Sequence, residues 1–285
     1  MFSLTILSEN LVRGAGLLGE HGLAYWLDTG THRVLFDTGQ GMALLPNARR
    51  LGIDLAQADA IVLSHGHYDH VSGLPDALAA CPRAALWMHP GATVRRYQRT
   101  TGGKARRLST DFMEAAVFGS GREVRRVTEA AEVVPGLWVT GPIERIHPIE
   151  DTGGPFFLDE ELTTADPIAD DMAVYGVSPV GLSVVLGCCH AGLINTLEGI
   201  FSRHGRMPLR LLVGGLHLMS ARPERVGVTL DYLREVDPAE MGFGHCTGAE
   251  AVQRIRAEFP GRCREIHAGW TFPGGSARAR PEKTP

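Results

Sequence analysis

The sequence predicts an α+β protein built as a four-layer αββα sandwich, with two mixed β-sheets face to face and helices on both outer faces. Short apolar runs of strand length alternate with amphipathic helical stretches along nearly the whole chain. Sheets that are apolar on both faces must be covered on both sides, which favours stacked layers over one open sheet. The composition agrees, because 44% of the 285 residues are hydrophobic and 21% are charged, as in an ordinary globular protein.

The individual elements follow from these patterns in chain order. Strands are expected at residues 2–7, 23–29, 33–37, 60–63, 85–88, 137–140, 181–186, 209–213 and 241–243. Helices are expected at residues 41–51, 73–80, 193–204, 223–236 and 249–258. Pro223 suits the first turn of its helix. In the last helix, Ala249, Val252, Ile255 and Phe259 recur at helical spacing.

One domain is expected over residues 1–270, followed by a disordered tail at 271–285. The tail offers almost no side chains that a core could bury. Within the domain, residues from about 90 to 125 are expected to form a basic insertion. Its charge comes from a cluster of Arg95, Arg96, Arg99, Lys104, Arg106 and Arg107.

Charge and cysteine content exclude several classes of protein. The net charge of -4 provides no overall attraction to nucleic acid or anionic membranes, and no run approaches the ~20 apolar residues of a membrane span. The first residues alternate like a strand and lack the charged and apolar regions of a signal peptide. Five cysteines are an odd number in a long chain, which favours a reducing compartment. We therefore expect a cytoplasmic protein whose partner is a small molecule.

The strongest functional signal comes directly after the strand that ends at Leu63. Three imidazoles and a carboxylate occur there within six positions, and their burial is costly unless a cation satisfies them. Residues two apart in an extended segment point the same way, so the first two histidines form one pair. The following aspartate and histidine can face a second ion. A solvated polar turn is the alternative. The run is Ser64-His65-Gly66-His67-Tyr68-Asp69-His70.

This run resembles the His-x-His-x-Asp-His signature of the metallo-β-lactamase superfamily. The upstream run from Leu35 to Gly39 resembles the strand-and-aspartate element of that fold. Three later runs, at 187–192, 214–218 and 244–248, resemble the branch of 7,8-dihydropterin-6-methyl-4-(β-D-ribofuranosyl)-aminobenzene-5'-phosphate synthase-like metallohydrolases. Together these elements cover nearly the whole chain.

The resemblance implies two divalent metal ions. Zinc is the expected metal, and manganese or iron are the alternatives. The implied ligands are His65, His67 and His190 for one ion, and Asp69, His70 and His245 for the other. His190 and His245 each follow an expected strand, and for each the alternative is a buried, hydrogen-bonded histidine.

The chain departs from the superfamily at the position that usually carries a metal-bridging aspartate, where Cys188 follows Gly187. Cys188 could bridge as a thiolate, water alone could bridge, or Asp171 could reach in from another loop. A thiolate would favour a softer ion such as zinc. The alternative is that Cys188 is a small core residue and that Cys189 or solvent faces the site.

Further polar residues are candidates for catalysis and substrate binding. The expected catalytic residues are Asp69 and His217, which would manage proton transfer, although His217 could instead be a core histidine. Asp37 is expected to orient a ligand histidine through its second ring nitrogen. Arginine forks suit phosphate, although a solvated basic face is the alternative. The expected substrate-binding residues are His21, His89, Arg95, Arg96 and Arg99.

Together these features predict a dinuclear hydrolase in which a hydroxide bridging two metal ions attacks a phosphoester or phosphodiester of a small molecule. The arginine-rich loop and the branch resemblance favour phosphate. The alternatives are a thioester, ester or lactone hydrolase on the same site, an iron-dependent oxidoreductase, and a non-catalytic metal sensor. The sequence contains neither a serine nucleophile elbow nor a Walker phosphate loop.

Overall fold

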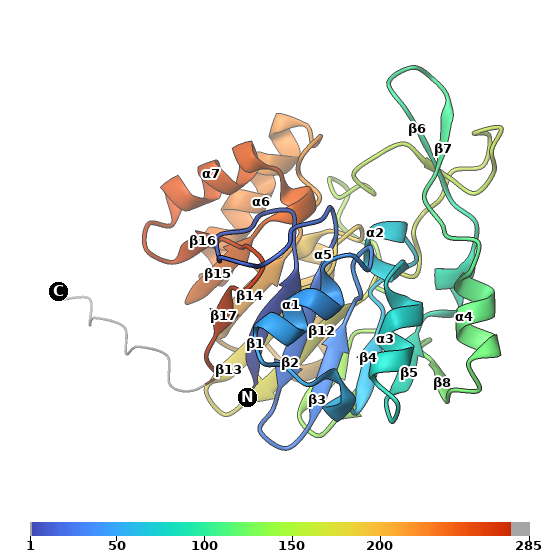
Figure 1. The fold of residues 1–285 in the computed structure, drawn as a ribbon. Coiled ribbons are helices and arrows are strands. Elements are labelled where there is room, and N and C mark those ends of the chain that lie inside the picture. Colours follow the sequence, from blue (N-terminus) through green and yellow to red (C-terminus); the bar gives the residue numbers. More distant parts are fainter. Residues whose placement is uncertain (1, 275–285) are drawn as a thin grey trace.

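The computed structural model describes residues 2–274, which form two seven-stranded sheets packed face to face (Figure 1). In spatial order, the first sheet contains β17 (Thr271–Phe272), β1 (Ser3–Ser8), β2 (Ala24–Asp28), β3 (Arg33–Phe36), β4 (Ala60–Val62), β5 (Ala85–Met88) and β8 (Val124–Arg126). The second contains β16 (Cys263–Glu265), β15 (Glu240–Phe243), β14 (Leu209–Gly214), β13 (Gly181–Leu186), β12 (Ala173–Ser178), β10 (Leu137–Val139) and β9 (Ala131–Val134). Both sheets mix parallel and antiparallel pairs, as expected.

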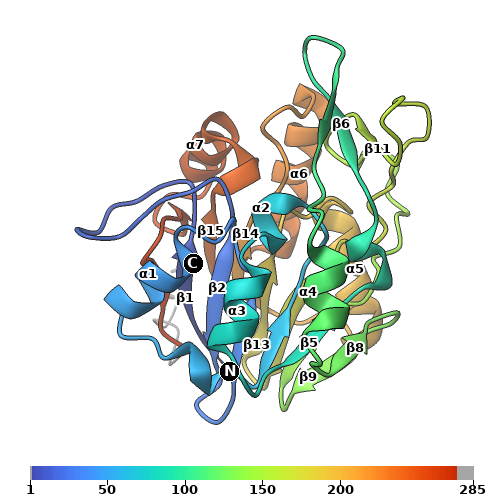
Figure 2. The ribbon, with the colours of Figure 1, turned by 45° about the vertical axis from the view of Figure 1, so that its right-hand side comes forward.

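Helices cover the outer face of each sheet, which completes the four expected layers (Figures 1 and 2). The helices on the first sheet are α1 (Leu44–Arg50), α3 (Leu74–Ala80) and α4 (Met113–Gly119). The helices on the second sheet are α5 (Leu193–His204), α6 (Pro223–Val236) and α7 (Ala249–Glu258). No described helix is both long and apolar enough to cross a membrane.

Alternation along the strands produces the layers. In β1, Leu4 and Ile6 face the second sheet, whereas Leu7 faces the helices on the outside. Leu211 and Val213 of β14 meet Leu4 and Ile6 in the cluster between the sheets. Burial of both faces therefore fixes the register, because a shift by one residue would exchange the two sides.

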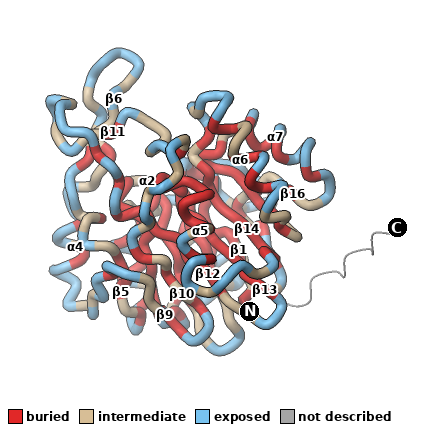
Figure 3. The backbone as a smooth tube through the Cα atoms, turned by 180° about the vertical axis from the view of Figure 1, so that it is seen from behind, coloured by how far each residue is buried: buried red, intermediate tan, exposed pale blue. Residues whose placement is uncertain are grey.

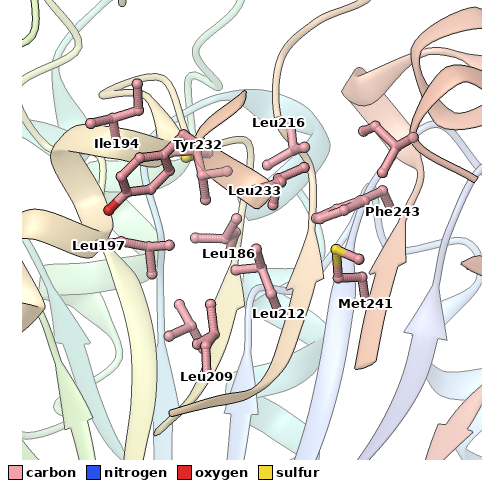
Figure 4. Close-up of a cluster of buried hydrophobic side chains, with 14 of the residues drawn as sticks. Leu186, Ile194, Leu197, Leu209, Leu212, Leu216, Tyr232, Leu233, Met241 and Phe243 are labelled. Atoms are coloured by element: carbon pink, nitrogen blue, oxygen red, sulfur yellow. The ribbon is translucent and has the colours of Figure 1, made fainter. Parts of the chain in front are cut away.

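The outer cluster of the second sheet fixes the strand ends that carry later functional residues. Leu186, Leu212 and Phe243 pack against Leu197 of α5 and Leu233 of α6 (Figure 4). Leu186 and Phe243 are the last residues of β13 and β15. This packing therefore positions the loops that leave both strands.

A small third sheet stands above one end of the sandwich (Figures 1 and 2). It consists of β11 (Phe156–Phe157), β6 (Tyr97–Arg99) and β7 (Ala105–Arg107). The β6–β7 hairpin is mostly exposed or half-buried, in contrast to the buried strands of the sandwich (Figure 3). The stretch expected as a basic insertion thus contains ordered structure, and its last part, β8, pairs with β5 in the first sheet.

The structure corrects the expected start of the tail. Thr271 and Phe272 form β17, which pairs with β1 through Thr5 and Leu4. The domain therefore continues past residue 270. The rest of the expected tail, residues 275–285, lies outside the described residues.

Candidate metal centre

The histidine motif leaves the end of β4 and enters the short helix α2 (Tyr68–Val71). The ring of His65 lies 4.5 Å from that of His67 and 4.3 Å from that of His70, measured between centroids. A Cβ at Gly66 would come within 2.1 Å of the Ala92 carbonyl oxygen. Glycine therefore lets this loop pass close to its neighbour and turn three buried imidazoles inward.

His65, His67 and His190 form a first ligand cluster, with ligand atoms within 4.8 Å of one another. The Nε2 atom of each is buried and has no hydrogen-bond partner. Nδ1 of His65 lies 2.9 Å from the Ser64 hydroxyl, and Nδ1 of His190 donates to the Thr152 carbonyl oxygen at 2.8 Å. Burial and the neighbouring imidazoles hold the pKa of all three rings well below the usual range. Three neutral imidazoles with unpartnered nitrogens at one point fit a divalent ion.

The carboxylate of Asp69 lies near both His70 and His245, and these three residues are called the second cluster. Oδ2 of Asp69 lies 3.3 Å from Nε2 of His245 and 3.9 Å from Nε2 of His70. Burial opposes charge on His70, but the carboxylates of Asp37 and Asp69 raise its pKa to about 9. Burial also opposes charge on Asp69, but His70 and hydrogen bonds from His21 and His245 hold its pKa well below the usual range. This cluster therefore pairs an anionic carboxylate with a cationic imidazole, whereas the three rings of the first cluster are neutral.

Cys188 lies between the two clusters, in the loop after β13. Its Sγ atom lies 3.1 Å from Nε2 of His70. The same sulfur converges within 4.8 Å with ligand atoms of His65, of His190 and of His245, each in a separate group. A single thiol thus faces ligands of both clusters.

The other candidates for this position face elsewhere. Sγ of Cys189 lies 3.6 Å from the Thr196 hydroxyl, inside the core cluster around α5. Asp171 uses Oδ2 to accept the Ala191 amide at 2.7 Å, and burial raises its pKa to about 7 despite that hydrogen bond. Asp171 joins no group of converging ligand atoms in the described part of the chain. Of the three candidates Cys188, Cys189 and Asp171, Cys188 is therefore the one that converges with the candidate ligand atoms.

Other side chains contact the candidate ligand histidines through the Nδ1 atoms of their rings. Oδ2 of Asp37 lies 2.7 Å from Nδ1 of His70, which matches the orienting role expected for it. Asn10 Oδ1 lies 2.9 Å from Nδ1 of His245, and Glu9 accepts the His245 amide at 2.6 Å. Glu9 and Asn10 were not predicted, because no local pattern links them to a histidine 235 positions later.

A cleft of about 510 Å³ opens over both clusters. Its lining includes the loop at residues 151–156, the loop at residues 217–222 and part of the β6–β7 hairpin. These segments come from distant parts of the sequence and meet at the end of the sandwich that carries α2 (Figure 2). A small molecule in this cleft would contact the ligand residues directly.

His217 and His21 both line this cleft. The ring of His217 lies 4.2 Å from that of His190, and its Nδ1 atom has no hydrogen-bond partner. Its φ of 48° is uncommon for a residue other than glycine and is typical of functional sites. His21 stacks on His245 at 4.9 Å, with Nε2 3.2 Å from Oδ2 of Asp69.

Arg96, which was expected to bind substrate, lies outside the cleft lining. It is buried, and its guanidinium bonds to Asp166 at 2.7 Å and to both oxygens of Asp170 at 2.8 and 2.5 Å. Asp170 also accepts the amide of Gly66 at 2.8 Å. The buried guanidinium of Arg96 therefore fastens the base of the hairpin to the metal loop by pairing with Asp166 and Asp170.

Three other expected substrate-binding residues lie outside the cleft lining. Arg95 is exposed to solvent. The Arg99 guanidinium stacks on the Phe157 ring at 4.7 Å, and Nδ1 of His89 accepts the Gly91 amide at 2.9 Å. Of the histidines and arginines expected to meet substrate, His21 is the one that lines the cleft.

The cleft is instead lined by two other arginines, Arg106 and Arg222. Arg106 donates to the Tyr68 hydroxyl at 2.6 Å, and its guanidinium lies 5.3 Å from the centre of that ring. Arg106 belongs to the basic cluster noticed in the sequence, but strand alternation decides which of its arginines turns inward. Arg222 precedes α6 and carried no sequence signal.

Comparison with known proteins identifies the family. The sequence model described as the metallo-beta-lactamase superfamily matches residues 18–164. The chain belongs to the metallo-β-lactamase superfamily. It is 27% identical, over 88% of each chain, to the 7,8-dihydropterin-6-methyl-4-(β-D-ribofuranosyl)-aminobenzene-5'-phosphate synthase of Methanocaldococcus jannaschii.

Solved structures of metallo-β-lactamase folds agree. A metal-dependent hydrolase of the β-lactamase superfamily aligns with a TM-score of 0.81 at 25% identity, covering 97% of this chain and 100% of the other. A diphosphatase of the PhnP family shares the fold with a TM-score of 0.54 at 16% identity, covering 95% of this chain and 96% of the other. The chain thus has the fold of metal-dependent hydrolases and carries plausible metal-binding residues.

The thiol of Cys246 also lies at the candidate metal centre, and it was not predicted from the sequence. Cys246 directly follows His245, and its ligand atom groups with those of His245 and Cys188. Burial opposes ionisation of Cys246, but its hydrogen bond with Cys188 and the nearby His217 hold its pKa well below the usual range. The run from Gly244 to Gly248 contained this signal, because a second ligand-type residue follows the histidine there.

Proposed function

We propose that this chain is a dinuclear metal-dependent hydrolase that acts on a phosphoester or phosphodiester of a small molecule. The observation that carries this proposal is that Cys188 converges with ligand atoms from both clusters, next to one cleft. Buried imidazole nitrogens without partners cost free energy, which bound ions would recover. Imidazole, carboxylate and thiol ligands together suit zinc best.

Two bound ions would supply Lewis-acid charge and lower the pKa of a bound water toward about 7. The chain's own residues would position the substrate and move protons. Asp69 stays a carboxylate and lies 3.2 Å from Nε2 of His21. We assign protonation of the leaving oxygen to His217, because its ring lies beside the first cluster and lines the cleft.

Two arginines in the cleft lining support an anionic substrate. Arg106 and Arg222 both line it, although the whole chain carries a net charge of -4. The Tyr68 hydroxyl bonds to Arg106 and holds its guanidinium over the ring. Planar guanidinium groups bind phosphate through paired hydrogen bonds. The archaeal relative is named as the synthase of a 5'-phosphate, which agrees with a phosphate-bearing ligand.

A synthase reaction on phosphate-bearing molecules is the second candidate. It is favoured by the archaeal relative, which is named a synthase and aligns over 88% of each chain. In that case an acceptor molecule, and not water, would receive the transferred group. A cleft of about 510 Å³ is within the size range of small-molecule sites.

The thiols support a reducing compartment. All five cysteines are buried and free of disulfides. Free buried thiols are usual in the cytosol and rare in secreted proteins. We therefore include a cytoplasmic location in the proposal.

Metal analysis followed by a substrate panel tests the proposal. We expect two zinc ions per chain and cleavage of phosphoesters or phosphodiesters in preference to thioesters and lactones. One ion per chain, or cleavage restricted to acyl substrates, would overturn it. Product analysis with and without added nucleophiles separates hydrolysis from the synthase reaction.

A pair of arginine variants tests whether Arg106 binds a charged group of the substrate. Arg106→Ala should raise KM for the phosphoester about tenfold, because one charge-assisted contact is lost, while bound metal stays constant. Arg99→Ala is the matched control, since Arg99 lies on the same hairpin but stacks on Phe157 outside the cleft lining. Equal KM values for the two variants would contradict a role for Arg106.

A further inference from the structure

Two cysteines from separate loops meet at the second ligand cluster. Cys188 follows β13, and Cys246 lies in the turn after β15, directly after His245. Their sulfurs and a ring nitrogen of His245 lie within 4.8 Å of one another. Sγ of Cys246 also donates to the carbonyl oxygen of Cys188 at 3.5 Å. Both cysteines line the cleft.

The backbone around Cys246 leaves space for its thiol. A Cβ at Gly215, in the loop after β14, would lie 2.5 Å from Sγ of Cys246. The Gly215 amide donates to the Gly187 carbonyl oxygen at 2.9 Å, which ties this loop to the one that carries Cys188. A side chain at position 215 would therefore collide with the sulfur of Cys246.

The remaining cysteines do not share this environment. Cys189 faces the core around α5, next to Thr196. Cys81 lies among apolar residues outside the first sheet, and Cys263 lies in the cluster outside the second. The meeting of Cys188 and Cys246 is thus specific to the ligand cluster.

We propose that Cys246 is a further ligand of the second ion, which with Cys188 and His245 makes a two-sulfur metal site. The inference rests on the proposed dinuclear centre and adds a ligand to it. Each thiol would lose its proton to solvent on binding, because the thiolate is the form that binds metal. Two soft sulfur ligands select thiophilic divalent ions such as zinc, iron(II) or cobalt(II) over magnesium and manganese.

Cobalt substitution tests this ligand directly. The full chain is depleted of metal, loaded with two equivalents of cobalt(II), and examined for near-ultraviolet absorption from sulfur-to-cobalt charge transfer. Cys246→Ser and Cys188→Ser should each lose about half of this absorption. Their weaker zinc site should lose affinity by at least about tenfold, since even residues behind the ligands have effects of that size. Cys189→Ser is the matched control and should retain both properties.

The outcomes separate this inference from the proposed function. Full absorption and full affinity in Cys246→Ser, with losses in Cys188→Ser, would overturn the role of Cys246 and leave the dinuclear proposal intact. Fewer than two ions bound to the unaltered chain would instead overturn the dinuclear proposal. If Cys246→Ser fails to fold, X-ray absorption of the unaltered zinc protein decides. Two distinct sulfurs at about 2.3 Å support the inference, and a single sulfur overturns it.

Discussion

The two ligand clusters lie side by side but are built from different chemistry. The first contains three neutral imidazoles, supported by the Ser64 hydroxyl and the Thr152 carbonyl. The Phe156 ring lies 5.3 Å from the rings of His67 and His190 and makes this side apolar. The second contains the Asp69 carboxylate beside the thiols of Cys188 and Cys246, and the carboxyl groups of Asp37 and Glu9 contact its histidines.

This difference suggests that two ions bound at one site would differ in Lewis acidity and in the way the protein holds them. An ion among neutral imidazoles keeps its full charge and is the stronger Lewis acid. An ion among a carboxylate and thiolates is largely neutralised and is held more by electrostatics. We therefore expect substitutions in the first cluster to abolish activity. Substitutions in the second cluster should instead lower the affinity for metal, each by a different amount.

The largest expected effect is that of His67→Ala. The loss of one of three nitrogens from the neutral cluster should remove at least half of the bound metal and lower kcat/KM by about a thousandfold or more. Metal analysis and steady-state kinetics measure both. His89→Ala is the control, because His89 lies outside the cleft lining. Unchanged stoichiometry in His67→Ala would show that the motif is not the site.

A smaller effect is expected at Cys188, where two substitutions should differ. Cys188→Ala should weaken the second ion first, since His65, His67 and His190 still hold the other. Cys188→Asp should keep both ions, because a carboxylate can replace the thiolate between the clusters. Metal titrations and melting temperatures compare the two. A well-folded alanine variant with both ions intact would rule out bridging by Cys188. A Cys188→Asp variant destabilised by several kcal/mol would indicate a buried, unpaired charge.

The smallest expected effect is that of Asp37→Asn. Asp37 orients His70 and does not converge with the ligand atoms. Its neutralisation should lower the affinity for the second ion about 10–100-fold and leave the first ion in place. Competition with a chelator measures the two affinities separately. Equal losses at both ions would remove the distinction drawn between the clusters.

Much of this centre could be predicted because its signals are local. His65, His67, Asp69 and His70 follow one apolar strand within six positions, and His190 and His245 each follow another strand. Strand ends at one edge of a sheet bring such residues together. The layers were predictable for the same reason, since apolar periodicity marks most strands and helices.

The remaining features depend on partners far away in the chain. Arg96 was expected to bind substrate, and its buried ion pairs were not predicted because Asp166 and Asp170 lie 70 and 74 positions away. Strand β12 was not predicted either, because Gly176 interrupts its short apolar run and its pairing with β10 and β13 comes from distant parts of the chain. Arg222 reaches the cleft through tertiary packing alone.

The buried Arg96 anchor has a consequence for how this protein can diversify. It joins the hairpin to the metal loop at the base of the hairpin, through Asp170 and the Gly66 amide. The tip, from Thr100 to Lys104, closes on itself with its own hydrogen bonds. Changes in the length or sequence of the tip therefore leave the metal loop in place. Because Gln98 and Arg106 of the hairpin line the cleft, we expect an exchanged hairpin to alter which molecules enter while the metal loop keeps its place.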